Sequence, residues 1–541
     1  MYKRYVMQLE RKSFIRGKVR KRRQFRKEDF WKGKCMEKIR IENLRSLKDT
    51  GQVELKPINV LVGGNSSGKS TFLRFFPLVK QSLGRKINGP ILWAGEDDDY
   101  VDFGSFDEAL NHNSGDGKIK FSFELEVPYV RIFGDDCLGF CSKRMKIKFY
   151  LERRVNTELD YVSEIEFKLN KKSASIIFGE MKNVKALYVN GRRYEIAGIE
   201  RKKDWYEYNR DIFDIPTDEI MKFINKKISN LLFDDNDRKI DYCHEKISVD
   251  TIWRYYSEKL DSNDISILEK YKNREIIEEI CSRRIDNFTE FEDMVILQEM
   301  LSIYHMGAST YLNDYFRNVF YIAPVRATAE RYYRLRNSSV DEVDCRGKNL
   351  PVFLNSLSES SFNNFRDWTN DSLGFCVEKS LSKGHISLKV RRKNSAKAVN
   401  ISDAGFGYSQ ILPIATQLWF IQNEFRVISN GLGETPITIV IEQPELHLHP
   451  ALQAKLVDVI VSIMKNSKNN IRFIIETHSE TIINRLGNLI YKEKLNKDQV
   501  NVMIFNKDFG DDDTTIQFGN FDEEGYLENW PAGFFEPEEV Q

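Results

Sequence analysis

Short apolar, strand-like runs of four or five residues recur along the chain, and segments with helical periodicity follow several of them. The runs lie at 58–62, 319–322, 386–390, 437–441, 471–475 and 502–505. The helical segments lie at 70–82, 409–421, 451–465 and 480–493. Apolar runs that alternate with helices are typical of a parallel sheet whose two faces are covered. The pattern predicts an α/β fold.

The middle of the chain has a different pattern. From about 99 to 190, partial alternation of polar and apolar residues predicts further strands. These strands lie at 118–127, 145–152, 162–169 and 186–189. From about 197 to 316 the chain is charged, aromatic and helical, as at 264–280 and 291–304, without the sustained heptads of a coiled coil. Because the early and late strands belong to one sheet, we expect an α/β unit split by a β-rich lobe and a helical insertion.

Composition narrows the class of protein. The chain has 541 residues, of which 41% are hydrophobic and 30% charged, and no apolar run is long enough to cross a membrane. An integral membrane protein is therefore excluded. The seven cysteines are scattered and odd in number, which favours reduced thiols and a cytoplasmic location. Cys137 with Cys141, and Cys243 beside His244, have no second ligand pair, so structural roles are favoured over zinc binding.

The N-terminal region is strongly basic. Residues 1–35 hold fourteen lysines and arginines against three acidic residues, whereas the whole chain has a net charge of +1. Such an arm can bind nucleic acid through its phosphates. The alternative is a tail without function, or a segment that precedes the true start at Met36.

Residues 63–70, Gly-Gly-Asn-Ser-Ser-Gly-Lys-Ser, form a complete phosphate-binding loop between a predicted strand and a predicted helix. Glycines allow successive backbone N–H groups to point at a phosphate, and the helix N-terminus adds its positive dipole end. We expect Lys69 to reach the β- and γ-phosphates and Ser70 to bring its hydroxyl to Mg²⁺. The sequence therefore predicts binding of a nucleoside triphosphate. The candidate nucleotide-binding residues are Gly63, Gly64, Asn65, Ser66, Ser67, Gly68, Lys69, Ser70 and Thr71.

Three further motifs surround this loop in the predicted fold. The strand 437–442 ends in Glu442, the pattern of a Walker B element whose acid holds Mg²⁺, so Ser70 and Glu442 are the candidate metal ligands. His478 follows another core strand in Glu-Thr-His-Ser, where an imidazole can sense a γ-phosphate by hydrogen bonding. Upstream, residues 402–410 (Ser-Asp-Ala-Gly-Phe-Gly-Tyr-Ser-Gln) form a small-residue loop that opens a helix; we call it the signature loop.

This set of motifs resembles ABC-type ATPases of the SMC and RecF group. The resemblance rests on the phosphate loop, the signature loop, Ile-Glu-Gln-Pro-Glu-Leu-His-Leu-His-Pro at 441–450 and Glu-Thr-His-Ser-Glu at 476–480. Within that group the chain is similar to bacterial single-chain AAA ATPases of defence systems, most of all to the ATPase subunit of Septu-type and retron-associated anti-phage systems. Tyr-Ile-Ala-Pro-Val-Arg at 321–326, Arg-Tyr-Tyr at 331–333 and Asn-Trp-Pro-Ala-Gly-Phe-Phe at 529–535 resemble the same subgroup.

The resemblance implies a P-loop NTPase of the ABC-head type and assigns the regions of the chain. Residues 36–196 are expected to form the first half of the ATPase head with its β lobe. Residues 318–541 form the second half, with the signature loop, the Walker B strand and the closing Trp-Pro-Ala-Gly-Phe-Phe segment. The helical insertion 197–317 separates the halves, and the basic extension 1–35 precedes them.

The resemblance also implies a site shared by two copies of the chain. Residues 63–71 and Glu442 of one subunit are expected to hold Mg-ATP, while the signature loop of the other closes over the γ-phosphate. His478 is the expected switch histidine. The signature-loop candidates for nucleotide contact are Ser402, Gly405, Gly407 and Ser409. A homodimer through the ATPase heads follows.

One residue departs from the pattern of this group. ABC-type enzymes usually follow the Walker B acid with a glutamate that acts on the attacking water, and this chain has Gln443. Glutamine orients water through its amide but accepts no proton, so we expect ATP hydrolysis that is slow or dependent on a partner. Glu445 is a substitute base, or else it braces the following helix. The candidate catalytic residues are Glu442, Gln443, Glu445 and His478.

Two other features have alternative interpretations. His447 and His449 form a His-x-His pair that a zinc ion can use, but without further ligands a structural or interfacial role is favoured. From Arg326 to Arg336, arginines interleave with tyrosines. This segment can either track nucleic acid or form a solvated face or a partner interface.

The preferred interpretation is an ABC-type ATPase that senses or regulates in an anti-phage complex and controls a separate effector such as an HNH-type nuclease. No TOPRIM nuclease domain fits between His478 and the end of the chain. Nucleic acid, as DNA or as retron RNA/DNA, is a further candidate partner. The alternatives are a RecF/SMC-like DNA-repair ATPase and a nucleotide-gated scaffold that never hydrolyses ATP; a transporter ATPase fits least.

Overall fold

The computed structural model describes residues 36–530 apart from several gaps. The gaps are 86, 97–98, 134–136, 156, 158, 181–182, 197–211, 233–254, 257–258, 260–273, 276, 279–287, 335–339, 341, 383, 394, 428–434 and 508–512. The basic extension 1–35, most of the predicted helix 264–280 and the Pro-Ala-Gly-Phe-Phe end of the closing segment therefore lie outside the described residues.

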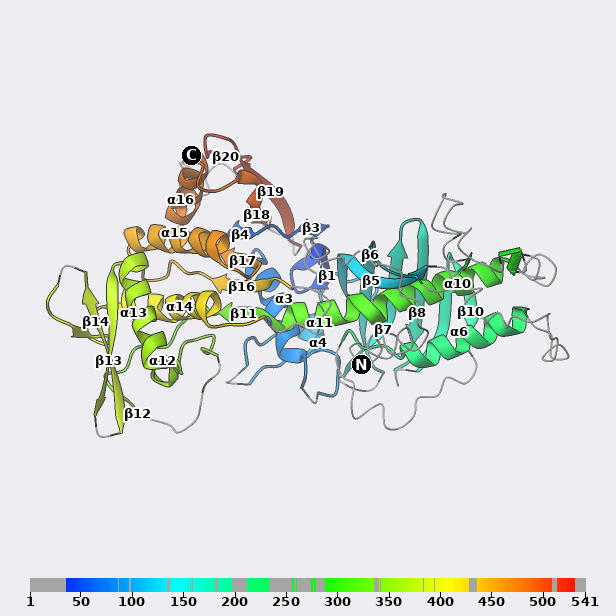
Figure 1. Cartoon of the computed structure of the whole chain (residues 1–541), viewed down its shortest axis with the longest axis horizontal. Coiled ribbons are helices and arrows are strands. Elements are labelled where there is room, and N and C mark those ends of the chain that lie inside the picture. Colours follow the sequence, from blue (N-terminus) through cyan, green and yellow to red (C-terminus); the bar gives the residue numbers. More distant parts are fainter. Residues whose placement is uncertain are drawn as a thin grey trace.

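A seven-stranded sheet forms the centre of the fold (Figure 1), in the strand order β11-β16-β17-β4-β18-β19-β20. Its strands are β11 (Val319–Ile322), β16 (Ile437–Glu442), β17 (Ile471–Glu476), β4 (Ile58–Gly63), β18 (Val500–Asn506), β19 (Thr515–Phe521) and β20 (Leu527–Glu528). The first five strands pair in parallel, whereas β19 and β20 are antiparallel. The predicted parallel sheet is confirmed, and it joins β4 to strands from the far end of the chain. The prediction is wrong for the run 386–390, which lies in β14 (His385–Arg392) of a separate antiparallel sheet, because an apolar run alone does not distinguish a parallel from an antiparallel strand.

Alternate residues of the central strands belong to two separate hydrophobic cores, which explains why these strands are apolar without interruption. Val440 of β16 and Ile474 of β17 pack in the core that contains helix α3 (Lys69–Ser82). Their neighbours Ile439 and Ile475 pack in the other core, against the helices on the opposite face. Those helices are α14 (Phe406–Asn423), α15 (Pro450–Asn466) and α16 (Glu480–Tyr491). The sheet is thus covered on both sides.

The region between α3 and β11 contributes most of a nine-stranded antiparallel sheet, the β lobe, whose main path runs β10-β9-β8-β7-β6-β5-β1-β2 while β3 pairs with β1. Its strands are β1 (Met36–Leu44), β2 (Leu47–Asp49), β3 (Val53–Glu54), β5 (Ile119–Phe133), β6 (Cys137–Arg153), β7 (Asp160–Leu169), β8 (Lys172–Phe178), β9 (Val184–Val189) and β10 (Arg192–Glu195). The short helix α4 (Phe106–Ala109) precedes β5.

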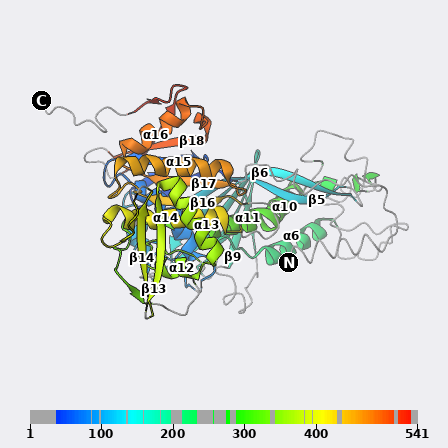
Figure 2. The ribbon, with the colours of Figure 1, turned by 60° about the vertical axis from the view of Figure 1, so that its left-hand side comes forward.

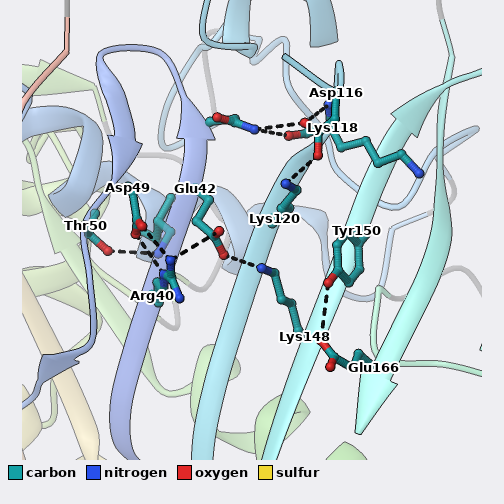
Figure 3. A network of polar contacts seen from close by, with 12 residues as sticks. Arg40, Glu42, Asp49, Thr50, Asp116, Lys118, Lys120, Lys148, Tyr150 and Glu166 are labelled. Carbon is teal, nitrogen blue, oxygen red and sulfur yellow. Dashed lines mark hydrogen bonds and ion pairs between the residues drawn. The ribbon is translucent and has the colours of Figure 1, made fainter. Parts of the chain in front are cut away.

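Charged side chains link strands on one face of the β lobe (Figure 3). Arg40 of β1 donates from Nε to Asp49 of the adjacent β2 at 2.8 Å, and opposite charges on adjacent strands stabilise their register. Lys148 of β6 lies 2.6 Å from Glu42 of β1, a pair that reaches across the intervening β5. This face therefore mixes both signs of charge and is held together by cross-strand pairs.

The other face of the β lobe packs against helices of the insertion. The described helices are α6 (Thr217–Leu232), α10 (Phe288–Ile303), a π-helical turn (Tyr304–Ala308) and α11 (Ser309–Arg317). Phe75 of α3 packs 4.7 Å from Phe121 of β5 and 5.9 Å from Phe316 of α11, measured between ring centroids. These aromatic contacts join the phosphate-loop helix to the lobe and to the insertion.

A four-stranded sheet lies at the opposite end of the molecule from the β lobe (Figures 1 and 2). It contains β12 (Tyr333–Arg334), β13 (Phe375–Ser382), β14 (His385–Arg392) and β15 (Val399–Asn400), with α12 (Leu350–Ser356) and α13 (Glu359–Leu373) beside it. The signature loop follows β15 directly and leads into α14. A 3₁₀ turn (Lys497–Gln499) precedes β18. Among the described residues, no helix is long and apolar enough to cross a membrane.

Candidate functional site

The phosphate loop connects the carboxyl end of β4 to the N-terminus of the 14-residue helix α3. Two of its glycines have backbone conformations that only glycine adopts easily, with φ 151° at Gly63 and 91° at Gly68. A Cβ atom on Gly63 would lie 2.3 Å from the carbonyl oxygen of Phe505, and one on Gly68 would lie 2.8 Å from Ser46 Oγ. Gly64, Asn65 and Ser66 are exposed at the loop tip. The loop is therefore shaped by close backbone packing at its ends and is open at its tip.

The side chain of Lys69, the first residue of α3, is enclosed by this loop. Its Nζ donates to the carbonyl oxygens of Gly63 at 3.0 Å and Gly64 at 2.5 Å, and lies 3.5 Å from Ser67 Oγ. The side chain is only 3% exposed, and burial lowers its pKa. A buried ammonium group surrounded by a loop at a helix N-terminus is a built site for an anion.

Two carboxylates lie beside the loop at the carboxyl ends of neighbouring strands. Glu442 ends β16, Glu476 ends β17, and the two are direct register partners. Ser70 donates from its hydroxyl to Glu476 Oε1 at 2.9 Å. Burial, together with the negative charge of Glu442, raises the pKa of Glu476 to about 7. The strand order therefore brings Glu476 into contact with the candidate metal ligand Ser70, and the second candidate, Glu442, lies at the end of the neighbouring strand.

Glu442 is held from two sides. Arg74 of α3 donates to it from Nε at 2.9 Å and from Nη2 at 2.6 Å, and Tyr321 of β11 donates from its hydroxyl at 2.7 Å. Glu442 is 2% exposed, and burial raises the pKa of Tyr321 well above its usual range. The candidate Walker B carboxylate is thus buried and held in place by an arginine fork and a phenol.

The remaining catalytic candidates lie next to these carboxylates. Gln443 has a left-handed backbone (φ 44°), and its N–H donates to the carbonyl of Glu476 at 2.9 Å. Glu445 accepts the backbone N–H of His478 at 2.6 Å, so residues 443–450, which we call the post-Walker B segment, are tied to the end of β17. Burial and the charge of Lys69 lower the pKa of His478, which keeps its imidazole neutral near pH 7.

Arg326 donates hydrogen bonds to the backbone at the end of β16. Its Nη2 donates to the carbonyls of Glu442 at 3.2 Å and Gln443 at 3.5 Å, and the side chain is 3% exposed. Burial lowers its pKa to about 10. Arg326 is therefore not part of an exposed arginine–tyrosine surface. Exposed members of that segment are Arg331, which pairs with Asp403 of the signature loop at 2.7 Å, and Tyr332.

The signature loop forms a separate feature at the N-terminus of α14. Gly405, with φ 99°, precedes the helix, and Ser402 donates to Asn400 Oδ1 at 2.9 Å. Ser409 is buried and donates to the carbonyl of Phe406 at 2.7 Å. Phe406 itself is 52% exposed. The loop thus presents an aromatic side chain outward on a rigid helix start.

A pocket of about 750 Å³ opens beside the signature loop. It is lined by aromatic and cationic side chains, among them Phe406, Arg392, Lys393 and Lys455. A Cβ atom on Gly407 would come within 3.0 Å of the carbonyl oxygen of His447, so the loop packs closely on the post-Walker B segment. This surface suits a partner that carries negative charge.

The two histidines of that segment have separate surroundings. The ring of His447 packs 5.0 Å from Phe406, and His449 Nδ1 accepts the N–H of Ala451 at 3.2 Å at the start of α15. Within the part of the chain that the structure describes, no group of three or more His, Cys, Asp or Glu side chains could hold a metal ion.

The donors at the phosphate loop are a hydroxyl and two carboxylates, the hard oxygen ligands that Mg²⁺ takes together with phosphates and water. These residues fit Mg²⁺.

Sequence reasoning assigned no role to Arg74, Tyr321 or Glu476. Arg74 is one helical turn beyond Ser70, so its place on the same face of α3 could have been inferred. Tyr321 and Glu476 occur in motifs that carried the resemblance, but nothing in the sequence indicates that they contact Glu442 and Ser70. Of the predicted residues, the structure gathers the phosphate loop, Glu442, Gln443, Glu445 and His478 at one sheet edge.

Comparison with known proteins gives one family and several solved structures. The family model described as "AAA ATPase domain" matches residues 36–483. A search of curated proteins finds no significant match. The chain is similar in fold to the crystal structure of an SMC head bound to the C-winged helix domain of ScpA. The two sequences are 11% identical, the match covers 90% of this chain and 97% of that chain, and the TM-score is 0.33. An SMC head domain from Thermotoga maritima has 9% identity, 90% and 98% coverage, and a TM-score of 0.33.

Proposed function

The chain belongs to the AAA ATPase domain family, and from this premise we propose that it is a regulatory ATPase that closes as a homodimer around Mg-ATP. Its fold is a P-loop NTPase of the ABC-head type, split by the β lobe and the helical insertion. The nucleotide state would be passed to a separate effector.

The observation that carries the proposal is the arrangement around Lys69. A buried ammonium group lies inside a glycine-shaped loop at a helix N-terminus, and the hydroxyl of the next residue touches a carboxylate at the sheet edge. Lys69 and the loop N–H groups would bind the phosphates, and Ser70 with Glu442 would hold Mg²⁺. When bound, Mg²⁺ neutralises the charge of the phosphate oxygens.

Turnover would depend on the segment between Glu442 and Glu445. Gln443 would orient the attacking water, and His478 would report the γ-phosphate through its neutral imidazole. Glu445 would be the base if one is used, although its carboxylate already accepts the N–H of His478. Because positioning supplies most of the catalysis in phosphoryl transfer, we propose slow hydrolysis.

The dimer proposal rests on the signature loop and its pocket. Phe406 is an exposed aromatic anchor of the kind enriched at interfaces, and Arg392, Lys393 and Lys455 line the pocket beside it. In the dimer, Ser402, Gly405, Gly407 and Ser409 would meet the γ-phosphate bound by the other copy. Cationic and aromatic lining next to a helix N-terminus supports an anionic counterpart.

We extend the proposal to anti-phage defence because the motifs at 321–326 and 331–333 resemble the ATPase subunit of Septu-type and retron-associated systems. The effector would be a nuclease on another chain, such as an HNH-type enzyme, and DNA or retron RNA/DNA would be the trigger or the target.

One residue favours a second function: Gln443 in place of a glutamate would suit a nucleotide-gated scaffold that never hydrolyses ATP.

Nucleotide binding and phosphate release, measured on the same protein, test these alternatives. A fluorescent ATP analogue should bind the wild type and fail to bind Lys69→Ala; normal affinity in the variant would remove the site assignment. Steady phosphate release that Glu442→Gln abolishes supports an ATPase. Binding without release by the wild type supports the scaffold instead.

A further inference from the structure

Glu476 is a buried acid with one free oxygen. Its side chain is 1% exposed, Oε1 accepts the hydroxyl of Ser70, and Oε2 has no hydrogen-bond partner among the described residues. A buried carboxylate oxygen without a partner costs free energy, because it has lost its water and gained nothing in return. Such an oxygen beside a candidate metal ligand points to a cation.

The neighbouring Glu442 differs in this respect. Both of its oxygens are engaged: Oε1 by Arg74, and Oε2 by Arg74 and Tyr321. A metal ion that bound Glu442 directly would have to share these oxygens with a guanidinium group. Glu476 requires no such exchange, because among the described residues the Ser70 hydroxyl is the only donor to its carboxylate.

The strand order explains why Glu476 lies nearer to the phosphate loop than Glu442 does. β17 lies between β16 and β4 in the sheet, so its end is adjacent to the phosphate loop, whereas the end of β16 is one strand further away. Glu476 is the register partner of Leu61 in β4. The last residue of β17 is thus placed next to the strand that leads into the loop.

We propose that Glu476 is the principal protein carboxylate for the divalent cation of the bound nucleotide, acting with Ser70, while Glu442 acts from one strand further away and fixes Arg74. This assignment rests on the proposed function, because the cation arrives with ATP. A cation beside Glu476 and Glu442 would also relieve the repulsion between these two buried acids.

Mn²⁺ is a suitable probe, since it takes the same oxygen ligands as Mg²⁺ and is counted directly by electron paramagnetic resonance. The experiment compares wild type, Glu476→Gln, Glu442→Gln and Asp458→Asn in the presence of a non-hydrolysable ATP analogue. Asp458→Asn is the matched control, because that carboxylate pairs with Arg485 on partly exposed helix surfaces away from the phosphate loop. Binding of the analogue in EDTA is measured in parallel, as is the melting temperature.

Glu476→Gln should raise the Mn²⁺ concentration at half saturation by about tenfold or more, the usual effect of disturbing a metal site. Glu442→Gln should raise it less, Asp458→Asn should leave it unchanged, and binding of the analogue in EDTA should stay within threefold of wild type. Glu476→Asp, which keeps the charge, should give an intermediate value and guards against a folding defect of the glutamine variant.

Mn²⁺ binding by Glu476→Gln at the wild-type level would overturn the assignment while leaving the ATP site intact. So would a larger loss in Glu442→Gln than in Glu476→Gln. Failure of the wild type to bind the analogue both with Mn²⁺ and in EDTA would overturn the proposed function itself, and the assignment with it.

Discussion

Removing Arg74 should destabilise the protein strongly, because it leaves the buried carboxylate of Glu442 without its guanidinium partner. The two side chains make two hydrogen bonds of 2.9 and 2.6 Å, and the Glu442 side chain is 3% exposed. Breaking a buried ion pair by removing one partner costs about 3–5 kcal/mol. A third of Arg74 is exposed and Tyr321 still donates to Glu442, so we expect Arg74→Ala to cost about 3 kcal/mol.

A double-mutant cycle separates this pair from general effects on the helix. In a Glu442→Gln background no buried charge is left behind, so Arg74→Ala should then cost only about 1 kcal/mol, the value of an ordinary hydrogen bond. The coupling between the two sites should therefore be about 2 kcal/mol.

Urea unfolding followed by tryptophan fluorescence, without nucleotide, measures these values. Arg485→Ala is the control, because Arg485 makes a similar fork to Asp458 with both bonds at 2.8 Å, but on a more exposed surface. We expect the control to cost no more than about 1 kcal/mol. If Arg74→Ala costs as little as the control, or if the cycle is additive, the reasoning about a fixed and buried Glu442 is wrong.

Three further predictions test other parts of the account. Gly63→Ala should lower the melting temperature, because its Cβ would meet the Phe505 carbonyl and backbone strain at φ 151° costs about 1–3 kcal/mol. Gly64→Ala is the control and should leave the melting temperature unchanged, because a Cβ there meets nothing within 4 Å. Equal effects of the two substitutions would contradict the loop geometry. Phe406→Ala should weaken ATP-dependent dimerisation by at least about tenfold, as loss of an interface anchor does, because this side chain is exposed on the signature loop. Binding of the ATP analogue by the monomer should stay unchanged. If the variant dimerises as tightly as the wild type, the signature loop is not part of the interface. His478 should titrate below about 6.5 by NMR, and Lys69→Met should raise that midpoint. Because the folded state disfavours the charged imidazole, stability should fall as the pH drops below about 6.5. A normal midpoint would contradict the burial of the imidazole as well as its proximity to Lys69.

The parallel strands of the central sheet could be predicted from the sequence, because burial on both faces requires an uninterrupted apolar run. Val440 and Ile441 face different cores, so the strand must be apolar throughout, and the same holds for β4, β17 and β18. The same pattern wrongly added 386–390, which belongs to a separate antiparallel sheet. The β lobe was harder to predict. β8 (Lys172–Phe178) was missed because lysine and serine weaken its alternation, and β5 was predicted to end at 127 but continues to Phe133, since its pairing with β6 outweighs the local pattern.

The contacts of the site that join distant positions of the chain could not be predicted from the sequence. The phosphate loop is local, so its eight residues identify it. The contact of Arg74 with Glu442 spans 368 positions, and that of Ser70 with Glu476 spans 406. Both depend on β17 lying between β16 and β4, an order that periodicity does not specify. The departure at Gln443 was visible in the sequence, but its left-handed backbone and the bond of its N–H to Glu476 were not.

The most direct test of the central claim is the molar mass of the purified protein in solution, measured by light scattering with no nucleotide, with Mg-ADP and with Mg-ATP. We predict that Mg-ATP alone shifts the mass from 63.5 kDa to twice that value, and that Lys69→Ala abolishes the shift. A mass that is the same under all three conditions, in a protein that binds ATP normally, would contradict the two-copy site.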